Sequence, residues 1–181
     1  IVLYDGIQAV KSIRFDSYRN VGSLMNQARV YAARDVDELV LIDVGMGGGD
    51  VRSGTSIISR FASELPAPLT YGGGIYSVDD ARAVLQAGAD RVLISAKYPR
   101  VAAEIVKELG SQAVVYAIDI DGEWMRGTEK KLVDCLHDAV WANVGEILLT
   151  QVQRDGERNG YDLELIAASR AVLPDMSIIA S

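Results

Sequence analysis

Short apolar runs rich in β-branched residues alternate along this chain with longer segments of helical periodicity. The runs that predict strands are 39–42, 68–71, 91–94, 114–118, 146–150 and 177–180. The segments that predict helices are 22–34, 54–64, 78–88, 100–109, 131–143 and 161–172. Ser77 is predicted to cap one helix at its start, and Gly88 and Gly110 lie where two helices are expected to end. Repeated strand–helix units predict an α/β fold with a parallel sheet, either open and doubly wound or closed as a barrel.

An internal repeat favours the barrel. A shift of 108 residues places Asp37-Glu38-Leu39-Val40-Leu41 on Gly145-Glu146-Ile147-Leu148-Leu149, and Leu65-Pro66 on Leu173-Pro174. Four strand–helix units, duplicated, give a (β/α)8 TIM barrel, although apolar units of this kind also resemble one another by chance. Counted from a short strand at Leu3-Tyr4, the chain supplies seven strands. We therefore expect residues 1–181 to form a single barrel domain with a half-barrel repeat, incomplete at both termini.

The composition excludes several classes of function. With a formal net charge of −7, the chain is not expected to bind nucleic acid, because phosphate backbones are held by basic surfaces. A small phosphorylated substrate remains compatible, since backbone amides bind phosphate without net positive charge. Cys135 is the only cysteine, so neither an internal disulfide nor a cysteine metal site is expected. We expect no cofactor, no metal and no membrane segment, and the cytoplasm is the expected location.

Candidate chemical groups lie where predicted strands end, because barrels of this kind place their active sites there. Gly72-Gly73-Gly74 follows one strand and precedes a helix, which favours close approach of the backbone to a phosphate, although flexible turns also use such runs. The run Gly47-Gly48-Gly49 is predicted to be a mobile loop.

Two aspartates follow later strands. Asp119 closes an otherwise apolar strand, so it is either a general acid or base or a cap of the turn at Ile120-Asp121-Gly122. Asp155 either caps the next helix or contributes to a phosphate site. His137, in the middle of a predicted helix, is given no catalytic role.

Several segments together resemble the cyclase subunit of imidazole glycerol phosphate synthase. They include Asp37 to Asp43, Pro68 to Ile75, Ala87 to Val92, Gly110 to Val115, Ala117-Ile118-Asp119, Gly145 to Thr150, and Arg154-Asp155-Gly156 followed by Gly160-Tyr161-Asp162. The sibling isomerase of histidine biosynthesis shares an Arg-Asp-Gly there, but Gly160-Tyr161-Asp162 favours the cyclase. The resemblance runs from Asp5 over nearly the whole chain.

The resemblance implies a reaction and a set of residues. Members of this family take ammonia from a glutaminase partner, in a heterodimer, and use it on a small-molecule substrate that carries two phosphates. Asp119 would be one of two catalytic aspartates, and Lys11 the lysine of the first loop that closes over the substrate. The residues expected to bind substrate or phosphate are Gly73, Gly74, Ser95, Thr150, Asp155 and Gly156. Glu38, Arg91 and Glu146 would ring the ammonia entrance at the opposite end of the barrel, although charged residues at strand starts also form routine ion pairs.

The chain departs from the family pattern at three places. The position of the other catalytic aspartate holds Val2 or Leu3, an Asn-Thr pair is replaced by Ser95-Ala96, and the loop after Asp119 is short. These changes favour a paralogue that passes ammonia to a separate sugar amidotransferase for surface polysaccharides. The alternatives are a working cyclase, a lyase of histidine biosynthesis, and a phosphosugar isomerase of the sibling type.

Overall fold

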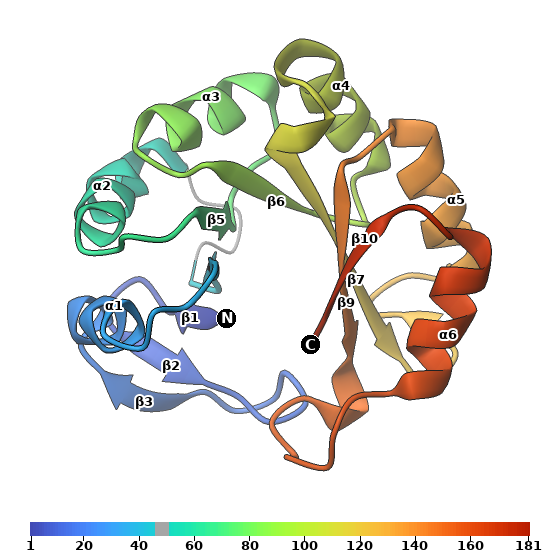
Figure 1. The fold of residues 1–181 in the computed structure, drawn as a ribbon, viewed down its shortest axis with the longest axis horizontal. Helices are drawn as coiled ribbons and strands as arrows, with labels where there is room; N and C mark the ends of the chain where they lie inside the picture. Colours follow the sequence, from blue (N-terminus) through green and yellow to red (C-terminus); the bar gives the residue numbers. More distant parts are fainter. Residues whose placement is uncertain (46–50) are drawn as a thin grey trace. The chain divides into compact units, whose positions relative to one another are not determined.

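The computed structural model describes residues 1–45 and 51–181 (Figure 1), so the glycine run 47–49 lies outside the described residues. The chain comprises two compact units. Unit 1 contains Ile1–Lys11 and Tyr18–Leu93, and unit 2 contains Ser12–Ser17 and Ile94–Ser181. A single domain over the whole chain stays a prediction.

Unit 1 is a parallel strand–helix array with a hairpin at its beginning. Its elements are β1 (Val2–Tyr4), β2 (Ala9–Lys11), β3 (Arg19–Gly22), α1 (Leu24–Ala32), β4 (Leu39–Asp43), η1 (Val51–Gly54), α2 (Thr55–Ser63), β5 (Leu69–Gly72), α3 (Val78–Gln86) and the first part of β6 (Arg91–Ser95). The pairs β1–β4, β4–β5 and β5–β6 are parallel. The pairs β1–β2 and β2–β3 are antiparallel.

Unit 2 continues the same alternation. Its elements after β6 are α4 (Pro99–Leu109), η2 (Ser111–Ala113), β7 (Val114–Asp121), β8 (Trp124–Met125), α5 (Leu132–Ala142), β9 (Glu146–Gln151), η3 (Val152–Arg154), α6 (Leu163–Val172) and β10 (Ser177–Ala180). β9 pairs in parallel with both β7 and β10, and β8 folds back on β7 as a hairpin. The helices of this unit lie along one face of its strands (Figure 1).

The predicted fold class is confirmed. Within each unit the parallel strands pair in chain order, without the reversal of order that marks an open doubly wound sheet. The described residues supply the seven expected strands of a (β/α)8 barrel, namely β1, β4, β5, β6, β7, β9 and β10. The 108-residue repeat also holds, because the shift carries β5 onto β10 and α2 onto α6.

The elements form where periodicity and caps direct them. The Oγ atom of Ser77 accepts a hydrogen bond from the Asp80 backbone N–H at 3.2 Å, which caps α3 as predicted. α4 buries Ala102, Ile105 and Val106, whose spacing places them on one face. β7 is buried over its first five residues, as expected for a parallel strand covered on both faces. No described helix is long and apolar enough to cross a membrane.

The short strands β2, β3 and β8 were not predicted. They are two to four residues long, and β3 is mostly exposed, so they carry no alternation of apolar and polar residues that a sequence could reveal. Their stability comes from antiparallel pairing with neighbours that are themselves in strands. The β8 hairpin extends β7 past Asp119, which the sequence had placed at the end of that strand.

Candidate functional site

Asp119 is the central polar group of unit 2. It lies in β7, partly buried, opposite Thr150 of β9 in the parallel register. Burial raises the pKa of the Asp119 carboxyl to about 6, against the lowering effects of a hydrogen bond from Thr150 and the positive charges of Arg126 and Lys97. A carboxyl with a pKa near neutrality can both accept and return a proton in one reaction cycle.

The structure separates the two interpretations of Asp119. β7 continues through Asp121, and the turn follows at residues 122–123, so Asp119 precedes the turn rather than capping it. The Asp119 backbone carbonyl accepts a hydrogen bond from the Arg126 N–H at 2.8 Å across the hairpin. The direction of the Asp119 side chain is therefore set by its place in β7, and its hydrogen bond with Thr150 joins β7 to β9.

Asp155 is held by a segment from the beginning of the chain. The Ser12 hydroxyl lies 3.5 Å from its Oδ2, and the Arg14 backbone N–H donates to its carbonyl at 3.0 Å. Burial raises the pKa of the Asp155 carboxyl, partly offset by the bond from Ser12. The cap of α6 is Asp162, which accepts from the Leu165 N–H at 3.0 Å, so Asp155 does not serve as that cap.

The glycines after β5 belong to unit 1. Gly73 has φ +113°, and a Cβ there would lie 2.4 Å from the Asp43 carbonyl oxygen, so only glycine fits. Gly74 also has a positive φ, of +69°. Lys11 ends β2 and is exposed. The predicted phosphate contacts of Gly73 and Gly74 stay predictions.

The first strand, β1, holds apolar Val2 and Leu3 at the position of the family's other catalytic aspartate, and it pairs with the strand that carries the buried acid Asp43. Val2 pairs with Leu41 and Tyr4 pairs with Asp43, so Val2 and Tyr4 share the face of β1 that Asp43 occupies on β4, while Leu3 faces the other way. Asp43 is 7% exposed, and the hydroxyl of buried Tyr71 lies 3.5 Å from its Oδ2. From the sequence, Asp43 was identified only as the last residue of a strand. Tyr71 lies within an apolar run, so nothing in the sequence indicated its contact with Asp43.

The charged residues at strand starts lie in both units. In unit 1, Arg91 forms an ion pair with Glu38, which also accepts a hydrogen bond from the Thr70 hydroxyl at 3.0 Å. In unit 2, Glu146 begins β9 and accepts a hydrogen bond from Ser177 at the start of β10. The Glu38–Arg91 contact is an ion pair in its own right, and a role in admitting ammonia stays a prediction for all three charged residues.

Reasoning from the sequence did not identify two cationic side chains, Lys97 and Arg126, that act electrostatically on Asp119. Lys97 follows β6 by two residues, and Arg126 directly follows β8. Ser95, a predicted phosphate ligand, accepts the Lys97 backbone N–H on its hydroxyl at 3.4 Å. Arg126 lies in the short loop after Asp119, and Lys97 directly follows the Ser95-Ala96 pair. The departures from the family pattern at these two places are the only sequence signal that pointed to them.

Comparison with known proteins gives a consistent result. The family model described as histidine biosynthesis protein matches residues 3–181. The imidazole glycerol phosphate synthase subunit HisF of Mycobacteroides abscessus is 34% identical over 197 residues, covering 98% of this chain and 76% of the relative. The same subunit of Chlorobium limicola is 38% identical, covering 90% and 70%, and that of Frankia casuarinae is 36% identical, covering 98% and 76%.

Proposed function

The chain belongs to the histidine biosynthesis protein family, within its imidazole glycerol phosphate synthase cyclase-subunit branch, and from this we propose that it is a working cyclase. It would use ammonia from a glutaminase partner on a substrate that carries phosphate. The observation that carries this proposal is Asp119, a carboxyl with a pKa of about 6 at the carboxyl end of β7. Its neighbourhood suits a group that transfers protons.

In the proposed mechanism Asp119 moves protons during ammonia addition and ring closure. At neutral pH most of this carboxyl is ionised, so it can accept a proton from the adding nitrogen, and its pKa allows it to return that proton later. Thr150 fixes the orientation of the carboxylate through their hydrogen bond. The proposed substrate- and phosphate-binding residues are Gly73, Gly74, Ser95, Thr150, Asp155 and Gly156, with Lys11 in the first loop.

The second candidate is ammonia channelling to a separate sugar amidotransferase. It is favoured by the first strand, where apolar Val2 or Leu3 stands at the position of the family's other catalytic aspartate. The names of the relatives support the cyclase at least as well, since those from Mycobacteroides, Chlorobium and Frankia are all synthase subunits. Under either candidate, Glu38, Arg91 and Glu146 are proposed to act at the entrance for ammonia.

The experiment that separates the candidates is turnover of the bis-phosphate substrate with an ammonium salt. We expect the chain to turn the substrate over, with kcat/KM falling as pH drops below about 6, where Asp119 becomes protonated. Asp119→Asn should reduce kcat at least ~100-fold. Asp175→Asn, an exposed carboxylate of the same unit, is the matched control and should keep wild-type turnover. No turnover by the wild type, with glutaminase binding retained, would replace the cyclase with the channelling role.

A further inference from the structure

Asn159 lies in the loop between η3 and α6, directly before a glycine. Asn159 and Gly160 are both exposed, and neither belongs to a helix or a strand. Gly160 has φ +86°, and a Cβ added there would meet nothing within 4 Å, so the chain is open on this side. The preceding Arg158 also has a positive φ, of +58°. The asparagine therefore lies at an irregular, open loop tip, the kind of place where covalent change is tolerated and accessible.

The backbone N–H of Gly160 is available for chemistry. It makes no hydrogen bond within residues 1–45 and 51–181, and the side-chain amide of Asn159 makes none there either. The Gly160 nitrogen is joined through the main chain to the residue whose side chain it would attack, so the reacting atoms are held close together. Glycine has no side chain to shield that nitrogen and moves freely between backbone conformations. Neither reacting group thus has to break an existing hydrogen bond.

The other three asparagines of the chain lack this combination. Asn26 lies within α1 and Asn143 follows α5. In both cases the next residue, Gln27 or Val144, donates its backbone N–H to a carbonyl at 3.2 Å. Asn20 lies in β3, and hydrogen bonds hold both the oxygen and the nitrogen of its side chain. Asn159 is also the only asparagine of the sequence that a glycine follows.

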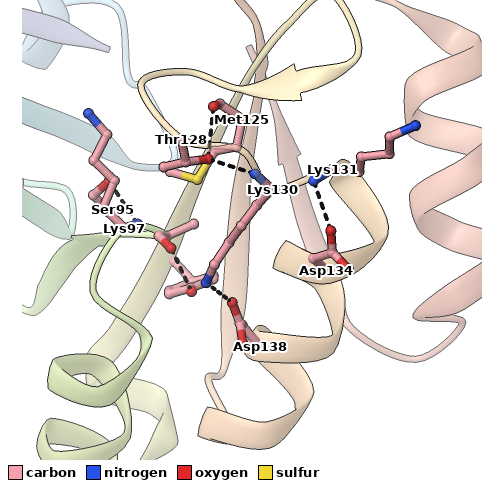
Figure 2. A network of polar contacts seen from close by, with 10 residues as sticks. Ser95, Lys97, Met125, Thr128, Lys130, Lys131, Asp134 and Asp138 are labelled. Carbon is pink, nitrogen blue, oxygen red and sulfur yellow. Dashed lines mark hydrogen bonds and ion pairs between the residues drawn. The ribbon is translucent and has the colours of Figure 1, made fainter.

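The loop after β8 in the same unit shows how a turn is held in place (Figure 2). The Thr128 hydroxyl donates to the Met125 carbonyl at 3.0 Å and accepts the Lys130 backbone N–H at 3.1 Å. The Lys130 ammonium forms an ion pair with Asp138 of α5 at 2.5 Å. Among the residues that the structure describes, no such network involves Asn159 or Gly160. The two loops therefore differ in how strongly their backbones are held.

We propose that Asn159 and Gly160 form a site of spontaneous modification, at which Asn159 loses its side-chain amide. The Gly160 nitrogen gives up its proton and attacks the Cγ atom of Asn159. A nitrogen–Cγ bond forms, the Cγ–Nδ2 bond breaks, and Nδ2 leaves with that proton as ammonia. Water then opens the resulting cyclic imide at either carbonyl carbon. Breakage of the new Cγ–nitrogen bond gives aspartate, and breakage of the main-chain bond gives isoaspartate, whose backbone is longer by a methylene group.

The modification falls directly before the start of α6. The Arg154 Nη1 atom donates to the Tyr161 carbonyl at 3.4 Å, and its Nε atom lies 3.7 Å from Asp162 Oδ2. Asp162 is the residue that caps α6. Both products place a new negative charge beside these contacts, and isoaspartate also lengthens the backbone that leads to them. The site goes beyond the proposed function and does not depend on it.

The test is incubation of the folded full chain in warm, mildly alkaline buffer, followed by peptide mapping with mass spectrometry. The peptide that contains Asn159 should show the mass change of amide to acid and separate into aspartate and isoaspartate forms, while the peptides with Asn26 and Asn143 stay unmodified. Hydroxylamine, which cleaves the cyclic imide, should cut the chain between Asn159 and Gly160. Asn159→Gln should lose both signals, because its larger ring closes slowly. Asn26→Gln, at an exposed position of α1, is the matched control and should keep them.

The same incubation in urea separates an open loop from a protected one. Because no hydrogen bond holds the Gly160 nitrogen, Asn159 should react in the folded chain at a rate close to that in the unfolded chain. A folded-state rate slower by ~10-fold or more would overturn the site, since reaction would then need local unfolding. No modification of Asn159, or equal modification of Asn143 in the folded chain, would also overturn it. These outcomes do not involve cyclase turnover, so failure of the site and failure of the proposed function are distinguishable.

Discussion

Replacing Asp119 with asparagine should stabilise the folded chain at neutral pH. The pKa of this carboxyl is raised from 3.8 to about 6 by burial, so the folded state holds the proton more tightly than the unfolded state. An ionised carboxyl of this kind destabilises the folded state by its full amount above the folded-state pKa. This destabilisation disappears below the unfolded-state pKa. Since each pH unit between the two values corresponds to 1.36 kcal/mol, keeping Asp119 ionised costs the fold about 3 kcal/mol at pH 7.

The assay is urea unfolding of the wild type and Asp119→Asn, followed by circular dichroism between pH 5 and pH 8. The variant should be more stable by about 1.5 kcal/mol at pH 5 and by about 3 kcal/mol at pH 7 and above. In thermal unfolding the neutral-pH difference corresponds to a rise of about 6–12 °C in Tm. Taking the difference between the two proteins removes the titration of every other carboxyl.

The result that would refute this reasoning is a stability difference that stays constant from pH 5 to pH 8. That outcome would mean that the carboxyl has a similar pKa in the folded and unfolded states. The main argument that Asp119 transfers protons would then be removed. Asp175→Asn serves as the control, because its exposed carboxyl should produce no pH-dependent difference. A stabilised but inactive Asp119→Asn would show that activity is maintained at the expense of stability.

Two further predictions concern charged residues. Glu146→Ala should weaken glutamine-dependent turnover while sparing turnover with added ammonium, measured as the ratio of the two rates; equal loss of both rates would remove Glu146 from the ammonia entrance. Lys130→Met should lower the free energy of unfolding by about 1 kcal/mol, because it breaks the partly exposed ion pair with Asp138. Urea titration at low and high salt measures this, and a Lys130 effect that salt does not reduce would argue against an electrostatic cause.

The regular elements were predictable because their signals are local. The expected helix at 100–109 is α4 (Pro99–Leu109), and the expected strand at 177–180 is β10 (Ser177–Ala180). Apolar spacing and caps are properties of neighbouring residues, so they can be read along the chain. The internal repeat was predictable for the same reason, since it compares one stretch of chain with another.

The surroundings of Asp119 were only partly predictable. The position of Asp119 and Thr150 followed from the strands that carry them, whose parallel register places them opposite each other. Arg126 reaches its place through contacts with Phe15, 111 residues away, and no pattern along the chain encodes such a contact. Loop residues of this kind are positioned by packing between distant segments, which is why sequence reasoning missed them.

The assignment of Ser12–Ser17 to unit 2 has a consequence for synthesis on the ribosome. Arg14 forms its ion pair with Glu157, which follows it by 143 residues. At a translation rate of roughly 5–20 residues per second, this segment waits about 7–30 s before its partner is made. During that interval it is exposed to proteases and chaperones while flanked by residues of unit 1, so the loop between β2 and β3 should be the last part of the early chain to become protected.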